Sequence, residues 1–126
     1  MREQSAVPDE LLLDDETHPI PFVRNIDIMA RNKKIDSVVM VVVIASPLQA
    51  DERSQYRFLI KVENYLDYVN GADFAAEFGS PAAGRILIQV SLHDDSDPIS
   101  EVNFNRMVPW AAANNATLML VEKPLN

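Results

Sequence analysis

The chain has 126 residues, no cysteine and a formal net charge of −8 at pH 7. Without cysteine there are no disulfides, thiolate metal sites or cysteine nucleophiles. The negative charge argues against non-specific binding to DNA or RNA, which depends on neutralising phosphates. The longest apolar run, residues 38–45, is far shorter than the roughly 20 residues of a transmembrane helix, and no signal peptide is visible. We therefore expect a cytoplasmic protein that binds neither nucleic acid nor membrane.

Residues 1–24 are predicted to form an acidic, partly ordered N-terminal arm, and residues 25–126 a single domain. The first twenty residues contain six acids and one base. Within the arm, Leu11–Leu13 is an apolar cluster that could dock on the domain or on a neighbouring subunit. A solvated terminus is the simpler interpretation, and a partner-binding segment is the alternative.

Two strands are predicted next. Residues 26–31 alternate apolar and polar side chains, which is the period of a strand. Residues 35–45 are dense in β-branched side chains, which predicts a strand buried on both faces. The polar turn at 32–34 would join them in a β-hairpin, and Pro47 would end the second strand.

The spacing of apolar residues predicts an amphipathic helix over residues 53–71, because one side of the helix would be buried. Asp51 is the expected N-cap, and Gly71 is the expected left-handed residue at the end. The predicted buried stripe consists of Phe58, Leu59, Val62, Tyr65, Leu66 and Val69.

The second half of the chain repeats the pattern. Phe74 and Phe78 predict one or two helical turns, and residues 85–92 alternate as a third strand. Asp97 and Pro98 favour the start of a helix that extends to about Asn114. Residues 117–122 form the last predicted strand.

Proline at position 109 removes a backbone hydrogen bond from this second helix. It predicts a kink, or two short helices that meet near residues 105–108. The expected buried face consists of Val102, Met107, Val108, Ala111 and Ala112.

The predicted order is strand, strand, helix, strand, helix, strand. Helical connections between successive strands favour parallel neighbours, whereas the hairpin adds an antiparallel pair. The expected fold class is α+β: a two-layer sandwich in which a mixed four-stranded sheet (ββαβαβ) carries two main helices on one face.

The run 61–71, KVENYLDYVNG, resembles the first helix of a small bacterial family known as a domain of unknown function. In that family a lysine precedes an aromatic–leucine pair, a second aromatic residue and a glycine. The family's hairpin begins with an Ile/Val-Asp pair, which Ile26-Asp27 matches. The spacing to Gly71 is one residue shorter than in the family, and Ser46-Pro47 replaces an aspartate. The resemblance covers residues 25–122, and it implies the fold but no activity.

The loop 93–97, HDDSD, is the candidate metal site, with His93, Asp95 and Asp97 as ligands. Oxygen ligands of this kind hold divalent cations, and the loop follows a predicted parallel strand, where ligands of open sheets often bind. It lacks the glycine and the glutamate of an EF-hand. The alternative interpretation is a solvated loop whose last aspartate caps the next helix.

Arg53, Arg57 and Lys61 are four residues apart and share one side of the first helix. They are candidates for docking an acidic partner or the protein's own acidic arm; a solvated helix side is the alternative. Trp110 is a candidate interface anchor if exposed, and a core residue if buried.

The sequence contains no serine–histidine–aspartate arrangement, zinc spacing or phosphate-binding glycine loop, and no cofactor is predicted. The leading hypothesis is a non-catalytic interaction or accessory protein that binds a protein partner or associates with itself, for example as a homodimer. An immunity or inhibitor protein that masks a basic partner is its sharper form, because acidity would speed that encounter. The alternative is a small-molecule or divalent-metal-binding enzyme that uses loop 93–97.

Overall fold

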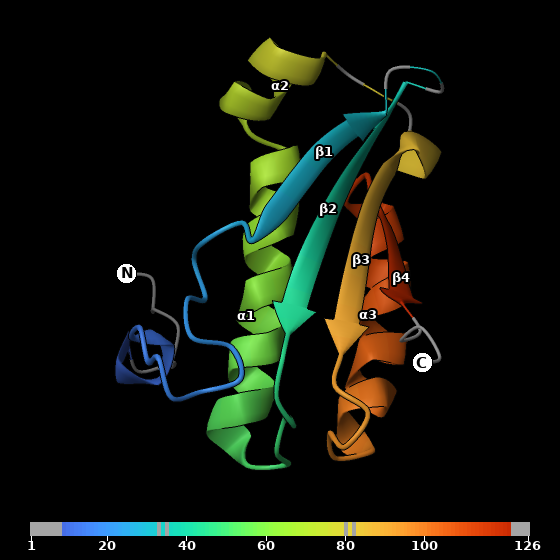
Figure 1. The fold of residues 1–126 in the computed structure, drawn as a ribbon. Coiled ribbons are helices and arrows are strands. Elements are labelled where there is room, and N and C mark those ends of the chain that lie inside the picture. The colour runs from blue at the N-terminus through green and yellow to red at the C-terminus, as the bar shows by residue number, and fades with distance from the viewer. Residues whose placement is uncertain (1–8, 33, 35, 80, 82, 122–126) are drawn as a thin grey trace, which may run out of the picture.

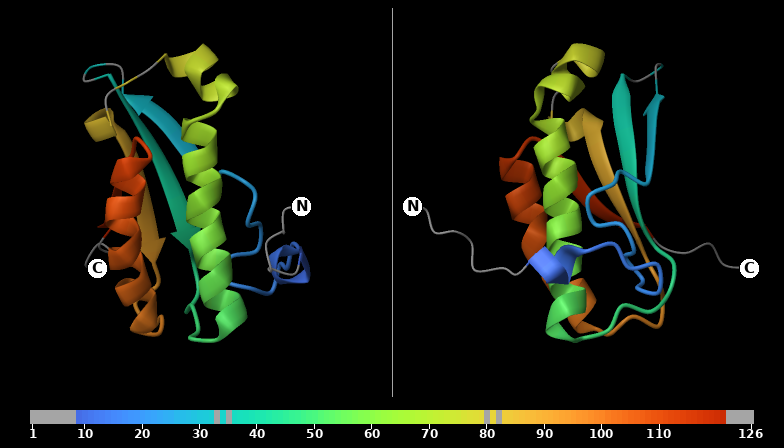
Figure 2. Two further views of the ribbon diagram at one scale, coloured as in Figure 1. Left: turned by 180° about the vertical axis from the view of Figure 1, so that it is seen from behind. Right: turned by 90° about the vertical axis from the view of Figure 1, so that its left-hand side faces the viewer.

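A computed structural model describes residues 9–32, 34, 36–79, 81 and 83–121. Its architecture is a four-stranded sheet with helices on one face (Figures 1 and 2). In chain order the elements are η1 (Asp9–Leu12), β1 (Ile28–Asn32), β2 (Ser37–Ile44), α1 (Glu52–Val69), α2 (Ala72–Phe78), η2 (Ala83–Arg85), β3 (Ile86–Leu92), α3 (Ile99–Ala113) and β4 (Thr117–Val121).

The sheet has the order β1-β2-β3-β4, with β1 antiparallel to β2 and the other neighbours parallel. The predicted α+β fold class and mixed sheet are therefore confirmed. One row of aligned residues crosses the whole sheet, from Ile28 through Val41 and Gln89 to Met119.

Strand β2 is buried on one face only. Val38, Met40, Val42 and Ile44 are buried, whereas the intervening valines are partly exposed. The prediction of burial on both faces is wrong because α1 and α3 lie on the same side of the sheet (Figure 2). The residues on the other side form what we call the open face: Ile28, Ala30, Val39, Val41, Val43, Leu87, Gln89, Ser91, Thr117, Met119 and Val121.

Helix α1 begins as predicted, with the carboxylate of Asp51 accepting a hydrogen bond from the backbone N–H of Ser54. Its end differs from the prediction. Asn70 is the C-cap, and Gly71 has a φ of −97° and is the N-cap of α2. The side-chain amide of Asn70 donates to the carbonyl of Leu66, which also accepts from the backbone N–H of Asn70.

The buried stripe of α1 is shifted relative to the prediction. Leu59 is 37% exposed, whereas Ser54, Arg57 and Lys61 are buried together with the remaining apolar residues. The reason is a tertiary one: the segment that precedes β1 covers the side of α1 that carries these three polar residues.

Helix α3 continues through Pro109, so the two-helix alternative is wrong, while the kink stays a prediction. Pro109 and Asn105, whose carbonyl loses its helical partner, both lie on the exposed side. Water can therefore satisfy that carbonyl. The predicted buried face is also partly wrong: Val102 is 44% exposed and Ala112 is exposed, while Ser100, Phe104, Met107 and Ala111 are buried.

The chain enters the sheet through residues 9–27, called here the N-terminal segment. Ile20 and Val23 are fully buried in the core, and β1 begins at Ile28, two residues later than predicted. Residues 1–8 of the predicted arm and Glu122 of the predicted last strand lie outside the described residues. Within the described part, no helix has the length and apolarity needed to cross a membrane.

Candidate functional site

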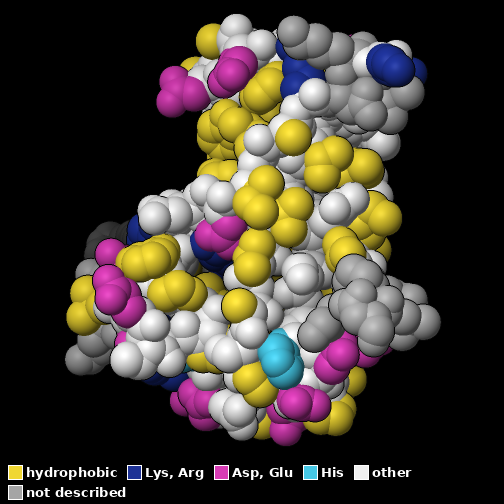
Figure 3. Space-filling view, in the orientation of Figure 1, with side chains coloured by type: hydrophobic (Ala, Val, Ile, Leu, Met, Phe, Trp, Pro, Cys, Tyr) yellow, Lys and Arg dark blue, Asp and Glu magenta, His cyan; other side chains and the backbone are white. Residues whose placement is uncertain are grey.

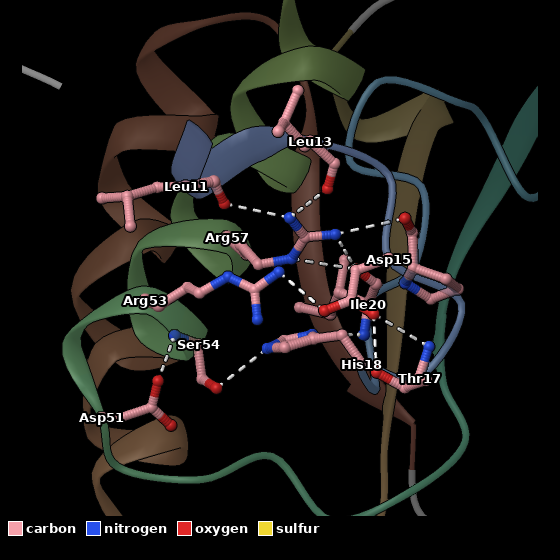
Figure 4. A network of polar contacts seen from close by, with 11 residues as sticks. Leu11, Leu13, Asp15, Thr17, His18, Ile20, Asp51, Arg53, Ser54 and Arg57 are labelled. Carbon is pink, nitrogen blue, oxygen red and sulfur yellow. Dashed lines mark hydrogen bonds and ion pairs between the residues drawn. The ribbon is translucent and has the colours of Figure 1, made fainter. Parts of the chain in front are cut away.

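The guanidinium of Arg57 points from α1 into the N-terminal segment (Figure 4). Its Nη1 donates to the carbonyls of Leu11 and Leu13 at 2.9 and 2.7 Å. Its Nε and Nη2 donate to Ile20, and Nη2 also reaches Pro21. The side chain is 0% exposed. A single buried cation therefore binds the backbone of both ends of a loop.

Lys61 repeats this arrangement one turn further along the helix. Its ammonium donates to the carbonyls of Phe22 and Asn25 at 2.6 and 2.8 Å and to the carboxylate of Asp27 at 2.9 Å. It is 2% exposed, and these three acceptors use all three of its protons.

Asp27 connects this part of the helix to the sheet. Its second carboxylate oxygen accepts from the backbone N–H of Val43, and its own N–H donates to the Tyr65 hydroxyl at 2.8 Å. That hydroxyl donates in turn to the carbonyl of Val41. Burial raises the pKa of Tyr65, so the hydroxyl stays a donor. Asp27 and Lys61 form an ion pair at 2.9 Å.

Arg53 lies at the more exposed end of the same row. It forms an ion pair with Asp15 at 2.7 Å, and Asp15 also accepts two hydrogen bonds from Thr17. The hydrogen bonds from Thr17 and from Arg53 hold the pKa of Asp15 well below its usual range.

His18 completes the contact between the segment and the helix. Its Nδ1 accepts from the backbone N–H of Ile20 at 2.9 Å, so its Nε2 carries the proton and donates to the hydroxyl of Ser54 at 2.9 Å. Burial and the nearby guanidinium groups of Arg57 and Arg53 lower the pKa of His18. The imidazole is therefore held in its neutral form.

The sequence-predicted basic row thus contacts the protein's own N-terminal segment. The solvated interpretation is wrong for Arg57 and Lys61, since both are buried. Sequence reasoning missed their main acceptors because those are backbone carbonyls, which every residue carries. The N–H groups of both side chains are buried and already hydrogen-bonded. Arg57 and Lys61 therefore stabilise the fold and have no donor left for a substrate.

The loop 93–97 is organised by its own backbone. The Nδ1 of His93 accepts from the N–H of Asp95, and the carboxylate of Asp97 accepts from the N–H of Ile99 at the start of α3. Ser96 and Asp97 each bond to the backbone of Leu48. In the described part of the chain, no three His, Asp or Glu side chains come together as a metal site. The three predicted ligands are therefore not assembled.

A groove of about 520 Å³ lies between α1 and α3, the two helices that lie on one face of the sheet (Figure 2). Each helix contributes residues at positions i, i+3, i+4 and i+7, which places them on one side of that helix. The lining residues are Glu52, Gln55, Tyr56, Leu59, Asn103, Arg106, Met107 and Trp110.

The polar amides of the groove are already satisfied. Gln55 accepts from Asn103 and donates to Ser100 and to the carbonyl of Gln49. The available surface is therefore aromatic and aliphatic, and the half-buried Trp110 forms part of it. Of the groove residues, only Trp110 was singled out from sequence; the exposed Leu59 was placed in the core.

The outer surface of the helices is acidic. Of the four basic residues in α1, α2 and α3, Arg57 and Lys61 are buried and Arg53 is paired with Asp15, which leaves Arg106 exposed. All the acids of these helices are exposed: Glu52, Glu63, Asp67, Asp73, Glu77 and Glu101. The helical surface therefore carries more exposed acids than bases, and the groove lining itself contains one of each, Glu52 and Arg106.

Comparison of the chain with protein-family models, with curated proteins and with solved structures finds no match.

Replacing Arg57 with leucine should lower the free energy of unfolding by about 3 kcal/mol, because several carbonyls would lose their buried partner. Arg53→Leu, one turn earlier, is the matched control and should have a clearly smaller effect, since its ion pair is partly solvated. Urea unfolding of both variants measures the difference. Equal losses would contradict the role given to Arg57.

Protonation of His18 should destabilise the fold. The folded pKa is depressed, so the unfolded state binds the proton more readily and stability falls as the pH drops below the ordinary value of 6.5. Asp15 and Asp51 also face the ring and oppose the shift without reversing it.

Unfolding measured from pH 7.5 to 5 should show this loss in the wild type and in His93→Gln, the control at the second histidine. It should be absent in His18→Gln. A His18→Gln profile that matches the wild type would refute the assignment.

Proposed function

We propose that this chain is a small, non-catalytic cytoplasmic interaction protein that binds a basic protein partner in the groove between α1 and α3, as an immunity or inhibitor protein would. The observation that carries the proposal is the apolar groove on a helical surface whose acids are exposed. Apolar walls supply affinity, and charge at the rim supplies selectivity and a fast encounter.

The shape of the groove favours an amphipathic helix as its occupant. Two helices with a groove between them accept a third helix whose apolar residues follow the same spacing. Tyr56, Leu59, Met107 and Trp110 would contact the apolar side of that helix. Lysines or arginines beside it would meet acids such as Glu52 and Glu63, which are exposed on α1.

The alternative, an enzyme that uses loop 93–97, has weaker support. One nitrogen of His93 and the carboxylate of Asp97 already accept backbone hydrogen bonds. Asp97 also sits at the start of α3, where a carboxylate has a structural role in capping.

The proposal can be tested with two synthetic helices of about 20 residues. The two peptides are identical on the apolar side and carry either lysines or glutamates on the other side. Trp110 is the only tryptophan of the chain, so its fluorescence reports binding of tryptophan-free peptides. The basic peptide should bind at least about tenfold more tightly than the acidic one, a difference of about 1.4 kcal/mol.

Leu59→Asp should abolish this binding. Met119→Asp, which adds the same charge at a similarly exposed position on the open face (40% against 37%), should leave it intact. Equal binding of the two peptides, or unchanged binding by Leu59→Asp, would rule out the proposed site.

A further inference from the structure

We propose that the open face of the sheet binds a second copy of this chain. Figure 3 shows hydrophobic side chains gathered over the sheet, with most of the charged side chains nearer its ends and one side. The row Ile28–Val41–Gln89–Met119 crosses all four strands on this face. Its two outer members, Ile28 and Met119, are among the most exposed large hydrophobic residues that the structure describes.

The open face carries no ionisable side chain. This is notable in a chain with 19 acids and 11 bases, because every strand contributes at least two residues to the face. Depletion of charge is the compositional mark of interface centres, and homodimer interfaces are more apolar than the rest of a protein surface.

The absence of charge on the open face also favours one kind of binding partner. A partner with a charged surface would have to desolvate its charges against a face that offers no countercharge. A second copy presents an uncharged face of the same extent. Helices α1 and α3 lie on the far side of the sheet in each copy (Figure 2), so face-to-face packing keeps the acids of these two helices apart although each chain carries −8.

The size of the face sets the strength of the contact. Four strands about 4.8 Å apart and about 20 Å long cover roughly 400 Å² of flat sheet. This is below the roughly 800 Å² per partner of a standard interface. We therefore expect a weak dimer, with a dissociation constant in the micromolar range or above. The helices remain uncovered, so each copy would keep its groove free.

Sedimentation of the full chain tests the inference. The protein concentration should run from about 10 µM to about 1 mM, the range that suits an interface of this size. The average mass should rise from 14.1 kDa toward twice that value. Met119→Lys should stay monomeric over the whole range, although it makes the net charge less negative and so weakens general repulsion. Val102→Lys, the same change at a similarly exposed position on α3 (44%), should dimerise like the wild type.

A wild type that remains monomeric at the highest concentration would overturn the inference, as would a Met119→Lys protein that dimerises normally. A second measurement does not depend on the folding of any variant. In a mixture of isotope-labelled and unlabelled wild type, nuclear Overhauser contacts between copies should involve the methyl groups of Met119 and Val41. Contacts from Val102 instead would place the interface on the helices and contradict the proposal.

Discussion

The burial of two cationic side chains, Arg57 and Lys61, is the constraint on which the rest of this structure depends. A guanidinium or ammonium group can be removed from water only if its N–H groups find acceptors. The N-terminal segment supplies them as backbone carbonyls. The two buried cations and the conformation of the N-terminal segment therefore depend on each other. The same contacts bring Asp27 to the edge of β2, where its carboxylate accepts from Val43, and β1 begins at the next residue.

The burial of these two cations determines the charge of the exposed helical surface. Because the bases of α1 are turned toward the N-terminal segment, the helical surface is left acidic around an apolar groove. On the opposite surface, the open face, none of the residues that the four strands contribute is ionisable. The two surfaces differ in chemistry and lie on opposite sides, so a basic partner and a second copy would not compete for the same position.

The fold could be predicted from sequence because it follows from periodicity and from a few capping residues. The alternating strands and the Asp51 cap are local signals, and the structure has both. Burial was less predictable, because it depends on which elements pack together. The valines of β2 suggested two covered faces, yet α1 and α3 both lie on one side of the sheet (Figure 2). Leu59 matched the core spacing but borders the groove. The basic row was visible in the sequence, but carbonyl acceptors leave no sequence signal. The metal hypothesis relied on residue types alone, and the loop uses those residues for its own turn and cap.

The central claim is that Arg57 is a buried cation bound to the backbone of the N-terminal segment. Nuclear magnetic resonance of the arginine Nε–H groups tests this directly. Arg57 should exchange its Nε proton much more slowly than the exposed Arg24 and Arg106, and its Nε should show scalar coupling through the hydrogen bond to the carbonyl carbon of Ile20, whose oxygen lies 3.1 Å away. An Arg57 proton that exchanges as fast as that of Arg106, with no such coupling, would contradict the account.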